Sequence, residues 1–271
     1  MSAVIEMISY PFMVRALIGG ILVSLCASLL GVSLVLKRYS MIGDGLSHVG
    51  FGALAVASAL NMAPLAVAVP VVILAAFILL RLSDNGRLKG DAAIAMISTG
   101  ALAVGVMVVS VTTGMNSDLN SYMFGSILAM SKSDVVLSVV LSVIVLVLYL
   151  LFYDKIFAVT FDAVFARATG IRTGLYNMLL AVLTSVTVVL GMRMMGALLI
   201  SSLIIFPALT AMRVCKRYRS VILCAVAVSV VSFILGMTVS FLLATPAGAS
   251  IVIVDIVLYF IFWLAGAVRG K

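Results

Sequence analysis

The sequence predicts an all-α integral membrane protein, a polytopic helical bundle of about nine transmembrane helices. Hydrophobic residues make up 65% of the 271 residues, charged residues only 10%, and the mean hydropathy is +1.37. Soluble domains are nearer half apolar and a quarter charged, so a soluble fold is excluded. At roughly 20 apolar residues per span the length accommodates about eight to ten spans. We therefore expect a single transmembrane domain over residues 1–271.

Apolar stretches bounded by charged residues, glycine, proline or asparagine mark the expected spans in chain order. A tight turn around Gly191 is expected between the sixth and the seventh span. The spans cover residues 12–36, 41–60, 64–81, 92–112, 133–153, 173–191, 195–212, 220–243 and 249–268.

Two connections are longer than a turn. Residues 119–130 are semi-apolar but too short to cross a bilayer, so we expect a re-entrant or surface helix there. In residues 154–172, Phe161, Val164 and Phe165 stand among polar residues. That pattern predicts an amphipathic helix at the membrane surface, where a partner could dock.

Basic residues are concentrated in alternate connections, which fixes the expected orientation. Fourteen of the 17 Lys and Arg residues lie on one side: Lys37 and Arg38; Arg81, Arg87 and Lys89; Lys155, Arg167 and Arg172; Arg213, Lys216, Arg217 and Arg219; Arg269 and Lys271. The positive-inside rule places these connections in the cytoplasm, the N-terminus outside and the C-terminus in the cytoplasm. Such a division requires an odd number of spans, which favours nine. The net charge of +8 then reports orientation and gives no reason to expect a nucleic-acid partner.

Asp44 and His48 are the main candidates for chemistry within the spans. Ionisable residues cost about 2.5–3.5 kcal/mol or more at the centre of a membrane, so each is a functional candidate. Four residues apart on a helix, the two side chains share one face and can meet one ion. A carboxylate and an imidazole suit zinc, manganese or ferrous iron, and two ligands per chain would become four in a twofold dimer. The alternative is that Asp44 caps its helix and His48 is a hydrogen-bonded core residue.

Asp255 in the last span is the other buried carboxylate candidate. We expect it to pair with Arg15 at similar depth in the first span, as an ion pair that fixes helix register, and the less favoured alternative is that Asp255 is a metal ligand. No Gly-x-x-x-x-Gly-Lys-Ser/Thr loop occurs in the sequence, so the chain is not expected to be an enzyme that hydrolyses ATP through a P-loop. No permanently bound cofactor is expected.

Five segments in order resemble the membrane permease subunits of metal-ion ABC importers, the zinc, manganese and iron uptake family. The first, KRYSMIGDGLSH, contains Asp44 and His48 and resembles the family signature at the start of the second span. The last, at residues 195–213, contains the pair Pro207 and Ala208 and resembles the family's late span. The other three are residues 87–94, residues 118–127 with a Phe-Gly pair, and residues 161–170.

The resemblance implies a type II ABC-importer-like permease in a prokaryotic cell (inner) membrane. Its implied partners are a second copy of the chain, a cytoplasmic ABC ATPase dimer, an extracytoplasmic metal-binding protein and the lipid bilayer. Asp44 and His48 would be transient ligands of the transported metal, and Asp118 would face the binding protein. The segment that couples to the ATPase would contain Asp162, Phe165, Ala166 and Gly170.

The late span is more similar to zinc-uptake members than to manganese members, so the resemblance favours Zn²⁺, with Mn²⁺ or Fe²⁺ as alternatives. A second class of function is an ion-coupled secondary metal transporter. That class predicts more carboxylates within the membrane and paired broken helices in two halves, which the sequence does not offer. A third is a structural membrane subunit whose buried charges only hold helices together.

Overall fold

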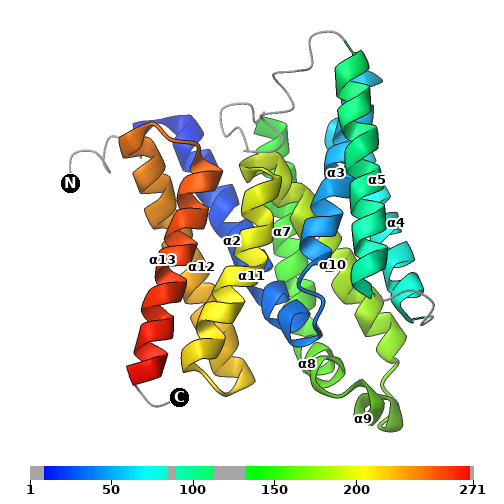
Figure 1. The fold of residues 1–271 in the computed structure, drawn as a ribbon, viewed down its shortest axis with the longest axis vertical. Coiled ribbons are helices and arrows are strands. Elements are labelled where there is room, and N and C mark those ends of the chain that lie inside the picture. The colour runs from blue at the N-terminus through cyan, green and yellow to red at the C-terminus, as the bar shows by residue number, and fades with distance from the viewer. Residues whose placement is uncertain (1–8, 85–89, 113–131, 269–271) are drawn as a thin grey trace.

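The computed structural model describes residues 9–84, 90–112 and 132–268, and the regular structure of these residues is α-helical (Figure 1). The helices are α2 (Pro11–Leu36), α3 (Ile42–Ala59), α4 (Pro64–Asp84), α5 (Gly90–Val111), α7 (Lys132–Leu151), α8 (Tyr153–Phe161), α9 (Ala163–Ala168), α10 (Thr173–Met195), α11 (Ala197–Val214), α12 (Tyr218–Leu243) and α13 (Ala247–Val268). Each predicted span coincides with one of the longer helices.

The number of membrane spans is smaller when length and composition alone are used as the criterion. Within the described residues, six helices are long and apolar enough to cross a membrane: α2, α4, α5, α10, α12 and α13. The pair α7 and α8 qualifies as a seventh span only together, and it is bent by 68°. The apolar part of α11 is short, and α3 contains four glycines besides Asp44 and His48. The helical bundle is therefore confirmed, whereas nine spans stays a prediction.

The bundle is built around α2 and α10. In these two helices 72% and 78% of the apolar window is buried, against 22% in α5 and 17% in α13. Helix α2 packs against α7, α10, α11 and α12, and α13 packs against α11 and α12. In Figure 1, α3, α4 and α5 form one side of the molecule, and α12 and α13 form the other. Peripheral helices thus carry the most exposed apolar surface, as a lipid-facing layer requires.

Glycines let α3 approach its neighbours closely. A Cβ on Gly52 would lie 2.6 Å from the carbonyl oxygen of Ala101 in α5, and a Cβ on Gly45 would lie 2.6 Å from Cγ2 of Ile94. Such contacts are possible only where a side chain is absent, which is why small residues recur at membrane helix interfaces. The face of α3 that bears these glycines is therefore held tightly against α5.

The predicted turn around Gly191 is wrong. Gly191 lies inside α10, packed against Ile200 of α11, and the chain reverses at Gly196. Gly196 has a φ of +91°, a conformation that glycine adopts without steric cost. Hydropathy did not locate this turn because the residues between the two glycines are mostly apolar methionines. With one residue between α10 and α11, the start of α11 is held beside α10 and α3.

Several connections rich in basic residues lie at one end of the bundle. Figure 1 shows the α2–α3 connection, α8, α9, the α11–α12 connection and the end of α13 together at the lower end. The start of α2 lies at the opposite end. The charge asymmetry noted along the sequence therefore corresponds to two chemically different ends of the molecule.

Candidate functional site

Asp44 and His48 lie on one face of α3, as their spacing predicts. Asp44 is the third residue of the helix, and Nε2 of His48 is 3.7 Å from Oδ2 of Asp44. Zinc bonds of about 2.0–2.2 Å in tetrahedral geometry hold two ligand atoms roughly 3.3–3.6 Å apart. A small rotamer adjustment would therefore let both side chains bind one ion.

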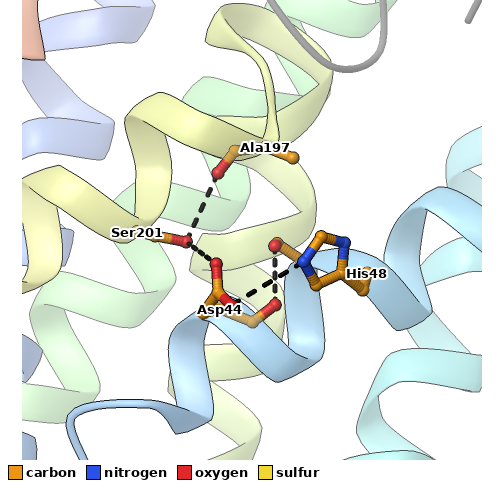
Figure 2. A network of polar contacts seen from close by, with 5 residues as sticks. Asp44, His48, Ala197 and Ser201 are labelled. Carbon is orange, nitrogen blue, oxygen red and sulfur yellow. Dashed lines mark hydrogen bonds and ion pairs between the residues drawn. The ribbon is translucent and has the colours of Figure 1, made fainter. Parts of the chain in front are cut away.

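Ser201 of α11 completes the local set of polar groups. Its Oγ lies 3.2 Å from Oδ1 of Asp44 and 3.3 Å from the carbonyl oxygen of Ala197, so its single proton can serve either acceptor. Figure 2 shows the carboxylate of Asp44 between Ser201 and His48. Ser201 was not identified as a site residue from the sequence, because it lies 157 residues from Asp44. The available signal was a pair of adjacent serines in an apolar helix.

Access to the pair is partial. The side chain of His48 is 27% exposed and that of Asp44 is 40% exposed. No group of three or more His, Cys, Asp or Glu side chains within the described residues could hold a metal ion. Among the residues that the structure describes, a single chain thus brings one carboxylate, one imidazole and one hydroxyl together at this point, fewer strong ligands than a structural zinc site uses.

The segment expected to be one amphipathic helix consists of two short helices, α8 and α9. The carboxylate of Asp162 accepts hydrogen bonds from the backbone N–H groups of Val164 (2.9 Å) and Phe165 (2.8 Å), so it caps the N-terminus of α9. At the other end Gly170, with a φ of +84°, donates to Arg167 O, and Ile171 donates to Ala166 O. These two bonds form a Schellman motif. Both ends of α9 are therefore fixed.

Helix α9 presents apolar side chains outward. Val164 is 80% exposed and Phe165 is 65% exposed, whereas Ala166 is fully buried. Beside Gly170 lies a hollow of about 220 Å³, whose lining includes Lys155 and Arg172. The exposed side chains of Val164 and Phe165 form an apolar knob, and the hollow beside it is basic. Both lie at the end of the bundle that carries the basic connections.

The expected ion pair between Arg15 and Asp255 is not formed. Nε of Arg15 donates to the carbonyl oxygen of Pro11, 3.2 Å away. Asp255 is fully buried, and no described residue hydrogen-bonds its carboxylate oxygens. The hydroxyls of Ser202 and Ser232 are its polar neighbours. The pairing failed because α13 packs on α11 and α12, and equal depth in the membrane does not bring α2 beside it.

Asp118 and the segment 119–130 lie outside the described residues, so their predicted roles stay predictions.

Comparison with known proteins gives the class to which these features belong. Residues 9–266 match the ABC 3 transport family. A high-affinity zinc uptake system membrane protein, ZnuB of Haemophilus influenzae, is 30% identical over 250 residues, covering 92% of this chain and 96% of that protein. A manganese transport system membrane protein, MntC of Halalkalibacterium halodurans, is 29% identical over 254 residues, covering 94% of this chain and 87% of that protein.

Solved structures agree with the sequence comparison. The structure of PsaBC from Streptococcus pneumoniae in complex with Fab matches with a TM-score of 0.87 and 27% identity, over 97% of this chain and 94% of that one. An inward-facing conformation of a metal-chelate type ABC transporter matches with a TM-score of 0.76 over 92% of this chain and 85% of that one. At 15% identity, the second match supports the fold alone.

Proposed function

The chain belongs to the ABC 3 transport family and is a metal ABC importer permease, and on this premise we propose that it carries Zn²⁺ through the membrane. The ion would pass from an extracytoplasmic metal-binding protein to the cytoplasm, driven by ATP hydrolysis on a separate ATPase chain. The observation that carries the proposal is the Asp44–His48 pair, which is partly exposed and spaced to share one ion on a helix of the bundle.

The pair suits a site through which an ion passes. A transported ion must bind well enough to enter and weakly enough to leave. One carboxylate and one imidazole, with Ser201 as a weak third donor, satisfy both needs. In a homodimer a second copy would supply the same set across the shared axis, doubling the ligands while the two halves are close. Separation of the protomers would then halve the ligand set and release the ion.

Zinc is the preferred substrate because an imidazole nitrogen binds Zn²⁺ more tightly than Mn²⁺ in the general order of divalent metals. The zinc-uptake protein ZnuB among the relatives is in keeping with this choice. Manganese is the second candidate, because MntC and the manganese import permease ScaB of Streptococcus gordonii, 28% identical, are also relatives. Fe²⁺ suits the same donors.

The proposed topology has nine spans, an external N-terminus and a cytoplasmic C-terminus, in a prokaryotic inner membrane. The alternation of basic connections supports it, and so does their gathering at one end of the bundle (Figure 1). In this orientation α8 and α9 are cytoplasmic, and the ATPase would grip the knob formed by Val164 and Phe165. Asp162 and Gly170 would fix the knob's direction, Ala166 would seat it on the bundle, and Asp118 would face the binding protein.

Uptake by proteoliposomes tests this function. The permease, reconstituted with its ATPase and metal-binding protein, should accumulate zinc only when ATP is supplied. Accumulation driven by a pH or sodium gradient without ATP would instead establish the secondary transporter. Manganese in place of zinc, at equal concentration, decides the preferred ion.

Variants of the pair test the site itself. His48→Ala and Asp44→Ala should each reduce zinc uptake at least tenfold while the complex still assembles, because one strong ligand is lost in each. Arg15→Ala is the matched control, since it removes an ionisable side chain from another helix of the bundle and should leave uptake unchanged. Unimpaired uptake by both site variants would assign the pair a structural role.

A further inference from the structure

Three hydroxyl groups from three helices meet in the core near the end of the bundle that bears α8. Oγ of Ser33 in α2 lies 3.2 Å from Oη of Tyr149 in α7 and 2.9 Å from Oη of Tyr218 in α12. The two tyrosine oxygens are 3.2 Å apart. All three side chains are buried. Three hydroxyls carry three protons for three contacts, so the ring closes with each group donating once and accepting once, and such chains strengthen one another.

The ring of Tyr218 is also the surface on which α8 rests. Ring centroids of Phe157 and Phe161 lie 4.9 Å and 5.8 Å from that of Tyr218, and the centroid of Tyr153 lies 5.7 Å away. Phe161 is the last residue of α8, directly before Asp162, which caps α9. Tyr218 therefore touches the segment proposed to bind the ATPase with its ring, and two core helices with its hydroxyl.

From the hydroxyl ring, close contacts continue to the metal pair. Two residues before Ser33, Gly31 has its backbone against the carbonyl oxygen of Ile204 in α11, with no room for a Cβ. Cδ1 of Ile204 would lie 2.9 Å from a Cβ on Gly43, next to Asp44. One turn before Ile204, Ser201 contacts the carboxylate of Asp44. Each step is a tight contact that transmits displacement, because packed interiors have little free volume.

We propose that Tyr218 is the positioning residue that couples α8 and α9 to the helices around the metal pair, through the hydroxyl ring with Ser33 and Tyr149. The inference rests on the proposed function, in which the ATPase moves α9. A movement of α8 displaces the aromatic ring of Tyr218. Because the hydroxyl of Tyr218 is hydrogen-bonded to Ser33 and Tyr149, α2 and α7 move with it. Helix α2 then carries α11, and with it Ser201, relative to α3.

The test measures ATP hydrolysis and zinc transport separately, because a coupling role for Tyr218 is established only by a change in the ratio of the two activities. Tyr218→Phe keeps the aromatic contacts with α8 and deletes two of the three hydroxyl contacts. In proteoliposomes with the ATPase and binding protein, zinc moved per ATP hydrolysed should fall by a factor of about 2 to 30, the range that side chains along such networks produce. ATPase co-purification should be unchanged, since α9 is intact. A purely structural role would lower both activities together and leave their ratio unaltered.

Two further variants complete the design. Tyr176→Phe is the matched control, because its ring packs on Phe152 beside α8, 5.9 Å between centroids, and it lies outside the hydroxyl ring. Ser33→Ala opens the same ring with a smaller change, so it decides the question if Tyr218→Phe does not fold. Combined with Tyr218→Phe, it should add little further loss, since either change opens the ring.

The outcomes distinguish the two proposals. If Tyr218→Phe and Ser33→Ala move as much zinc per ATP hydrolysed as the wild type, the coupling role of Tyr218 is refuted, while ATP-driven uptake by the same complexes still supports the importer function. Absence of ATP-driven uptake by the wild-type complex overturns the importer function itself.

Discussion

Gly52→Ala adds one methyl group where the backbone of α3 closely approaches the backbone of α5. Its Cβ would lie 2.6 Å from the carbonyl oxygen and 3.3 Å from the carbonyl carbon of Ala101. Ordinary contact begins at 3.4 Å, and backbone atoms cannot rotate aside, so the helices must separate by several tenths of an ångström. Overpacking of this kind costs about 1–3 kcal/mol, partly offset by up to about 1 kcal/mol because alanine favours a helix over glycine.

Gly100→Ala in α5 isolates the packing cost, because a Cβ at that position has no neighbour within 4 Å outside the adjoining backbone of its own helix. It retains the helix-propensity gain without the clash. We expect Gly52→Ala to be less stable than Gly100→Ala by about 1–3 kcal/mol in thermal unfolding of the detergent-solubilised protein. Zinc uptake should fall as well, since Gly52 is one helical turn beyond His48. Equal unfolding midpoints for the two variants would refute the close-packing argument.

Two other predictions concern the turn after α9 and the residues Arg15 and Asp255. Gly170→Ala should cost about 1–2 kcal/mol of local stability because of its φ of +84°, and co-purification of the ATPase should drop. Gly174→Ala, where a Cβ also has free space, should bind the ATPase normally; equal binding by both variants would dismiss the role of the α9 turn. Arg15→Ala should change stability by no more than about 0.5 kcal/mol, and Asp255→Asn should not destabilise the protein, because the two residues do not pair and a buried carboxylate without a partner is itself unfavourable. A loss of about 3–5 kcal/mol of stability in either variant, the cost of breaking a buried pair, would show that Arg15 and Asp255 do form an ion pair.

Features set by neighbours along the chain could be predicted, and features set by packing could not. The helices follow from hydropathy, and the face shared by Asp44 and His48 follows from helix periodicity, since both depend on a few consecutive residues. The contact between Ser201 and Asp44 depends on how α11 packs beside α3, which no local pattern encodes. Depth in the membrane can be counted along a helix, but it does not identify the neighbouring helix, so Arg15 and Asp255 were paired wrongly.

Glycine content gives α3 a particular place in the biogenesis of the protein. Its 18 residues include Asp44, His48 and four glycines, and it is absent from the helices apolar enough to cross a membrane unaided. A charged residue costs up to about 2.5–3.5 kcal/mol on insertion by the translocon, the value at the centre of a helix, and the four glycines of α3 supply no apolar side chains to offset the cost of Asp44 in its first turn. The close contacts with α5 and α11 that compensate α3 form only after those later segments have been synthesised. The helix that carries the metal ligands is thus expected to be retained in the bilayer by its partners, so mutations in α5 or α11 can deplete the protein by failed insertion without touching the ligands.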